Sequence, residues 1–128
     1  MQFSEDELKR QSTQLLKWQE ELQSLLVEID SSPSLAELCC SLNRIKLEIR
    51  EEAMLARKVI RRKDFQGEIL YWLTVDELAF LLRTRVDSKP CPKLRENISQ
   101  VLALLSITID TLSAMPSYGA WFARVSSI

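Results

Sequence analysis

The sequence lacks histidine altogether and is poor in glycine and proline. Its 128 residues include two glycines and four prolines. Without histidine, a Ser-His-Asp triad, a Cys-His dyad and a histidine-ligated zinc or iron site are all excluded. A turn-rich β fold needs more glycine and proline than this chain has. Leucine is frequent instead, and 46% of the residues are hydrophobic, so we expect an all-α fold.

Long apolar runs are also missing. No stretch approaches the roughly 18 apolar residues in a row that a membrane-spanning helix requires, and we therefore expect no membrane span. The first ten residues, MQFSEDELKR, are polar, whereas a secretory signal begins with basic residues followed by an apolar core. Together with the odd number of cysteines, three, this favours an intracellular protein, cytoplasmic or nuclear, with free thiols.

The cysteines and carboxylates form no motif that is typical of catalysis or metal binding. Cys39 and Cys40 are adjacent and lack the Cys-x-x-Cys spacing of zinc and redox sites, while Cys91 lies between two prolines. Adjacent acids such as Glu20 and Glu21 point in different directions on a helix. No glycine-rich phosphate loop is present. We predict that the chain is not an enzyme and has no catalytic residues, metal, cofactor or small-molecule substrate.

Two long N-terminal segments carry apolar residues every three or four positions, which is typical of amphipathic helices. We predict helices over about residues 4–30 and 34–63. The first pattern also has the spacing of a heptad seam. The residues of the first stripe are Leu8, Leu15, Trp18, Leu22, Leu25 and Ile29, and those of the second are Leu35, Leu38, Leu42, Ile45, Ile49, Ala53, Ala56 and Ile60.

Capping signals mark where these helices begin and end. Ser4 with Glu7 has the spacing of a capping box, in which each side chain satisfies an exposed backbone donor of the other residue. Ser34 with Glu37 repeats that spacing at the start of the second helix, and Gly67 is a candidate C-terminal cap. The link between the two helices is short, which predicts a long antiparallel hairpin.

Two further helices are expected before residue 116. Thr74 and Glu77 form a third capping box, which predicts a short buried helix over about residues 75–85. The apolar segment just before it is compatible with a buried helical turn or with an extended link. A further stripe predicts a helix over about residues 93–114. We therefore predict that residues 1–116 form a three- to four-helix bundle built on the N-terminal hairpin.

The last segment, residues 117–128, is unusually aromatic for the end of a chain. Its apolar residues share one helical face, and an arginine stands beside them. Aromatic residues and arginine dominate the energy of protein interfaces, so we predict a partner-binding surface. Folding of this tail onto the open end of the bundle is an equally good interpretation. The predicted contact residues are Tyr118, Trp121, Phe122, Arg124 and Val125.

A basic cluster stands out although the net charge is only −1. It is formed by Arg57, Lys58, Arg61, Arg62 and Lys63 in the segment RKVIRRK. Such a cluster can contact phosphates or an acidic partner. The alternative is a solvated helix end whose cations complement the helix dipole and pair with nearby acids, namely Glu51, Glu52 and Asp64.

These observations favour a non-catalytic interaction or adaptor subunit. We expect it to bury leucine-rich and aromatic helical faces against a partner protein, or against its own copy, within a larger complex. The alternative is a nucleic-acid-associated helical bundle that holds a phosphate backbone through the basic cluster at residues 57–63.

Overall fold

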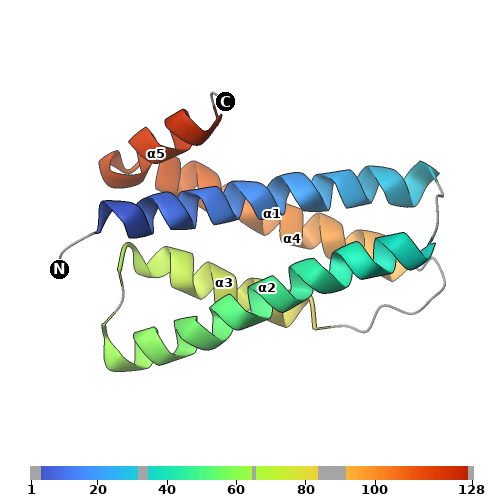
Figure 1. Ribbon diagram of the computed structural model, residues 1–128, viewed down its shortest axis with the longest axis horizontal. Coiled ribbons are helices and arrows are strands. Elements are labelled where there is room, and N and C mark those ends of the chain that lie inside the picture. Colours follow the sequence, from blue (N-terminus) through green and yellow to red (C-terminus); the bar gives the residue numbers. More distant parts are fainter. Residues whose placement is uncertain (1–3, 32–34, 65, 84–91, 127–128) are drawn as a thin grey trace.

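The computed structural model describes residues 4–31, 35–64, 66–83 and 92–126. These ranges form five α-helices and contain no strand (Figure 1), so the predicted all-α class is confirmed. The helices are α1 (Glu5–Ser31), α2 (Leu35–Arg62), α3 (Ile69–Leu81), α4 (Pro92–Ser113) and α5 (Pro116–Ser126).

The helices associate mainly as α2 with α3 and α1 with α4. Helices α1 and α2 run in opposite directions but diverge toward the end of the molecule where α1 begins and α2 ends (Figure 1). Their mutual contact is less extensive than the contact of α2 with α3 or of α1 with α4. A helical bundle is therefore present, whereas a bundle built on the α1–α2 hairpin is not confirmed. The reason is that the apolar helix α3 packs against the stripe of α2, and α4 and α5 pack against α1.

The predicted apolar stripes supply the core of the bundle. Buried stripe residues come from α1, α2 and α4, whereas Ile29, Ile60 and Leu94, near helix ends, are only partly buried. The buried members are Leu8, Leu15, Trp18, Leu22 and Leu25 of α1, Leu38, Leu42, Ile45, Ile49, Ala53 and Ala56 of α2, and Ile98, Val101, Leu105 and Leu112 of α4.

The start of α1 has only half of its predicted capping box. The Glu7 backbone N–H donates to the Ser4 hydroxyl oxygen at 3.5 Å. The Ser4 N–H donates instead to the side-chain carbonyl of Gln66 at 2.9 Å, since the Glu7 carboxylate accepts hydrogen bonds from Arg10 and Gln11. The first turn of α1 is thus tied to the segment between α2 and α3. The second capping box, Ser34 with Glu37, includes a residue outside the described ranges.

Helix α2 ends without glycine, so the prediction that Gly67 caps it is wrong. Lys63 adopts the left-handed conformation, with φ 55°. Its N–H donates to the Ile60 carbonyl at 3.2 Å, and the Asp64 N–H donates to the Val59 carbonyl at 3.1 Å. These two bonds form a Schellman motif, which satisfies the last carbonyls of the helix.

Helix α3 begins at Ile69, and the predicted start at residue 75 is therefore wrong. Thr74 lies inside the helix and is buried, so it caps nothing. Its hydroxyl shares a 3.0 Å hydrogen bond with the buried hydroxyl of Thr108 in α4. The apolar segment before Thr74 shows no helical periodicity because it is apolar on every side. Tyr71 and Trp72 are buried, whereas Ile69 and Leu73 are apolar but exposed. The helix ends at Leu81, so the predicted end at about residue 85 is also wrong; the N–H of the C-cap residue Leu82 bonds to the Leu78 carbonyl.

Among the helices of the described ranges, none alone combines the length and the apolar composition needed to cross a bilayer. One pair of segments in these ranges has the required length and apolar composition when taken together, namely Leu94–Ser113 and Pro116–Arg124. The two segments are bent by 114° relative to each other.

Candidate functional site

The aromatic C-terminal segment folds back onto its own chain. Helix α5 packs against α1 and α4, with Tyr118 and Phe122 buried in the core. A Cβ atom at Gly119 would lie 2.8 Å from the Ser113 carbonyl oxygen, so glycine lets α5 approach the end of α4 closely. Of the two interpretations of the tail, the structure has the one in which it closes the bundle.

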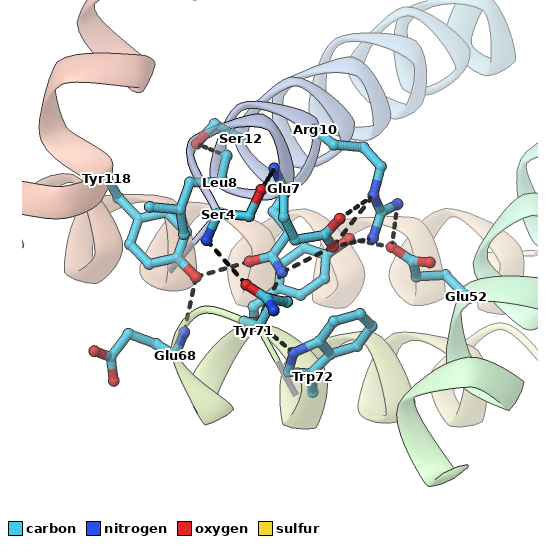
Figure 2. Close-up of polar contacts among 12 residues, drawn as sticks. Ser4, Glu7, Leu8, Arg10, Ser12, Glu52, Glu68, Tyr71, Trp72 and Tyr118 are labelled. Carbon is cyan, nitrogen blue, oxygen red and sulfur yellow. Dashed lines mark hydrogen bonds and ion pairs between the residues drawn. The ribbon is translucent and has the colours of Figure 1, made fainter. Parts of the chain in front are cut away.

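The Tyr118 hydroxyl is the centre of a buried polar network (Figure 2). It donates to the side-chain carbonyl of Gln11 at 2.7 Å and accepts a hydrogen bond from the Glu68 N–H at 2.9 Å. The Gln11 amide nitrogen donates in turn to the Gln66 carbonyl at 3.1 Å, which also accepts from the Trp72 indole N–H at 2.8 Å. Burial raises the pKa of Tyr118 to about 12, and the phenol therefore stays protonated.

Glycine is needed where this network meets the loop before α3. Gly67 has φ +80°, a conformation that residues with a side chain rarely adopt. A Cβ atom there would also overlap the Tyr118 hydroxyl oxygen and approach the Gln11 side-chain oxygen to 2.9 Å. Gly67 thus serves the docking of α5 on α1.

An ionic extension of the network joins α1 to α2 and α3. Arg10 bonds to the carboxylates of both Glu7, at 2.6 Å, and Glu52, at 2.7 Å. The Tyr71 hydroxyl donates to Glu52 at 2.5 Å, and burial raises the pKa of Tyr71 well above its ordinary value. Burial alone would raise the pKa of Glu7, but hydrogen bonds from Arg10 and Gln11 outweigh it, so that pKa is lowered.

The polar network is complete within the protein. No buried side-chain nitrogen or oxygen of the described residues lacks a hydrogen-bond partner. Each buried side-chain nitrogen or oxygen of the network thus has a partner in the same chain, and we interpret the network as structural.

The remaining tail residues lie nearer the surface. Trp121 is partly buried, with the Lys9 ammonium 5.9 Å and the Arg124 guanidinium 5.0 Å from its ring centroid. Trp121 and Arg124 also line a pocket of about 400 Å³ together with Glu5 and residues near the start of α5. The side chain of Val125 lies outside the described part of the structure. Trp121 and Arg124 are thus the predicted tail contacts that a partner can reach in this conformation.

The basic cluster projects from the end of α2. All five residues, Arg57, Lys58, Arg61, Arg62 and Lys63, are exposed. Arg57 forms an ion pair at 3.0 Å with Asp76 of α3. Among the described residues, no ion pair joins the cluster to Glu51, Glu52 or Asp64, the acids proposed from the sequence; Glu52 is instead bonded to Arg10 and Tyr71.

The sequence analysis missed a groove between α2 and α3, which we call the α2–α3 groove. It has a volume of about 510 Å³. Its walls carry cations and its floor is apolar, and Arg83 stacks on the Phe80 ring with its guanidinium carbon 4.1 Å from the ring centroid. The lining residues are Lys46, Arg50, Ala53, Met54 and Arg57 of α2, Ala79 and Phe80 of α3, and Leu82 and Arg83 just after α3.

Large apolar side chains are exposed in and beside this groove. Met54 is 55% exposed and Phe80 is 52% exposed, and both line it. Leu47, two turns before Met54 on the same helix face, is 56% exposed. A signal was present in the sequence: Lys46, Arg50, Ala53 and Arg57 are spaced by four, three and four, which places them on one helix face.

The described residues form no metal centre, and comparisons with known proteins give no match. Within the described ranges, no group of three or more cysteine, aspartate or glutamate side chains is placed to hold a metal ion. Comparison with protein-family models, with curated proteins and with solved structures finds no match for this chain.

Proposed function

We propose that the chain is a non-catalytic helical interaction subunit that binds a partner protein through the α2–α3 groove. The observation that carries this proposal is the exposure of Met54 and Phe80 in a groove between two packed helices. Contiguous exposed apolar surface rimmed by polar residues is typical of protein interaction sites. The chain would act in an intracellular compartment, cytoplasmic or nuclear, without a cofactor.

The C-terminal segment then has a supporting role. Because Tyr118 and Phe122 are buried in their own chain, they hold α1, α4 and α5 together and cannot contact a partner in this conformation. Trp121 and Arg124 offer a smaller second contact. This moves the proposed partner surface from the tail, where the sequence placed it, to α2 and α3.

The test is capture of partners from a lysate of the source cells with three forms of the protein. The first is wild type and the second is Met54→Glu/Phe80→Glu. The third, Val27→Glu/Ile107→Glu, is a matched control because these side chains are 68% and 64% exposed outside the groove. We expect wild type and control to capture the same protein and the groove variant to lose it. Equal capture by all three forms would contradict the proposal, provided that circular dichroism shows equal helix content.

A second candidate function is binding of a nucleic acid through the basic cluster. The exposure of Lys58, Arg61, Arg62 and Lys63 favours it. Binding of duplex DNA or RNA measured at two salt concentrations would decide, because each phosphate contact adds to the salt dependence of the affinity. A strong loss of affinity with added salt that disappears in Arg61→Glu/Arg62→Glu supports this function, and no binding at low salt removes it.

A further inference from the structure

The α2–α3 groove has the dimensions of a site for one helix of a partner. Its α2 wall runs from Lys46 to Arg57, which is about 16 Å at about 1.5 Å per residue, or three turns. The small residues Ala53 and Ala79 line the groove together with the larger Met54 and Phe80, and Ala53 is buried. Alanine in the lining leaves room for large apolar side chains of a partner, and methionine adapts its shape to them.

The α2 wall of the groove offers a partner no free backbone groups, because it is an interior part of an α-helix whose N–H and C=O groups are bonded within the helix. The other wall is the C-terminal turn of α3 with Leu82 and Arg83 just after it, and it presents no strand edge. A partner segment that enters the groove must therefore satisfy its own backbone, as a helix does and an added strand cannot. The expected anchors are apolar residues at positions i, i+3 or i+4, and i+7 of that helix.

The charges that line the groove indicate which charges the flanks of the partner helix should carry. Lys46, Arg50 and Arg57 stand on one wall and Arg83 on the other, and no carboxylate is among the lining residues. One acid outside the lining, Asp76, contacts it through an ion pair with Arg57.

A polyanion without apolar groups fits the groove less well. A phosphate backbone could contact the cationic rim, but it would leave the floor around Met54 and Phe80 exposed to water. Leucine-rich helices with acidic flanks satisfy both features, because burial of the apolar stripe supplies affinity and the charges supply orientation.

We infer that the partner of the α2–α3 groove is an amphipathic helix with an apolar stripe flanked by aspartate and glutamate. This inference rests on the proposed function and names the chemistry of the partner. Carboxylates of the bound helix would pair with Arg50 and Arg83, and its stripe would cover Met54 and Phe80.

A selection experiment tests the inference with a defined probe. A displayed library of 14-residue helices, about 21 Å long, carries leucine or serine at the stripe positions and aspartate, glutamate, lysine or arginine at the flanks. It is selected on the full chain, on Arg50→Glu/Arg83→Glu and on Lys58→Glu/Arg61→Glu. The last variant is a matched control, because it reverses two exposed cations outside the groove lining.

We expect the wild type and the control to enrich leucine stripes with acidic flanks, and Arg50→Glu/Arg83→Glu to enrich basic flanks. An acidic peptide from the wild-type pool should bind Arg50→Glu/Arg83→Glu at least about tenfold more weakly, which corresponds to about 1.4 kcal/mol.

Several outcomes would overturn the inference. They are the absence of enrichment, a pool without charge bias, and a bias that survives Arg50→Glu/Arg83→Glu. Duplex DNA that binds wild type and is lost with the same variant would assign the groove to a nucleic acid instead. If the charge bias is missing but capture of the cellular partner still depends on Met54 and Phe80, only the class of partner is wrong. If that capture is independent of the groove, the proposed function itself fails.

Discussion

At the scale of single residues, the molecule depends on a few polar side chains buried where α1, α3 and α5 meet. Tyr118, Gln11 and the backbone of residues 66–68 satisfy one another there. A buried polar group that loses its partner costs about 1–3 kcal/mol. Substitutions at this junction should therefore act on stability, whereas substitutions in the α2–α3 groove should act on binding.

Gly67→Ala should destabilise the protein by about 2 kcal/mol or more, because a Cβ atom is strained at φ +80° and overlaps the Tyr118 hydroxyl. Urea unfolding measures the change. In a Tyr118→Phe background the overlap with the hydroxyl is removed, whereas the backbone strain and the close approach to the Gln11 side chain remain, so the same substitution should cost less. An equal cost in both backgrounds would show that the hydroxyl does not limit the space at residue 67.

Tyr118 should also make stability depend on pH in alkaline solution. Burial raises its pKa in the folded protein to about 12, against 10 for the ordinary phenol. The folded state therefore holds the proton more tightly, and its contribution is full below pH 10 and is lost as the pH rises toward 12. The free energy of unfolding should fall less steeply between pH 10 and 12 in Tyr118→Phe than in wild type. Parallel slopes of the two proteins would contradict this assignment.

At the scale of elements, the helices with one clear apolar stripe could be predicted and the others only in part. The stripes of α1, α2 and α4 are unambiguous because each buries one face. The start of α3 was missed since Ile69–Leu73 is apolar on all sides, which removes the period that indicates a helix. The aromatic face of α5 was visible in the sequence, but which chain covers it depends on long-range packing.

The candidate site was harder to predict for the same reason. The cations of the basic cluster were evident as a run, yet the α2–α3 groove needs Arg50 and Arg83 together, and Arg50 belongs to α2 whereas Arg83 follows α3. Only the association of α2 with α3 creates the groove. A sequence pattern shows what one helix face carries, but not which other face lies beside it.

The contact between α3 and α4 includes one buried pair of hydroxyl groups, Thr74 and Thr108, 3.0 Å apart. Replacing either threonine by valine should destabilise the protein by about 1–3 kcal/mol, because the remaining hydroxyl loses its partner. The double replacement should cost clearly less than the sum of the two. A double-mutant cycle by urea unfolding measures this coupling, and additive costs would show that the pair is not coupled.

At the scale of the whole molecule, the chain hides most of its apolar stripes by itself. Its core draws on all five described helices. The first and the last of these helices, α1 and α5, pack against each other. The predicted burial of helical faces against a partner therefore concerns the apolar residues that stay exposed, such as Met54 and Phe80 in the α2–α3 groove. Partner binding would add to a folded protein and would not be needed to form it.

Thermal unfolding of the purified chain should accordingly be cooperative, with a midpoint that does not change with protein concentration. An obligate oligomer would show a midpoint that rises with concentration. Circular dichroism at protein concentrations that differ by about a hundredfold, together with sedimentation equilibrium, provides the measurement. Met54→Glu/Phe80→Glu should unfold at a similar temperature, because surface substitutions usually change stability by about 0.5 kcal/mol or less.

The bond between Tyr118 and Gln11 has a consequence for biosynthesis, since 107 positions separate the two residues. At about 5–20 residues per second, the ribosome adds Tyr118 about 5–20 s after Gln11. During that interval the nascent first helix has neither its hydroxyl partner nor the last helix that will cover it. Helix α1 can therefore complete its contacts only after Tyr118 has been synthesised, and newly made molecules should depend most on chaperones in those seconds.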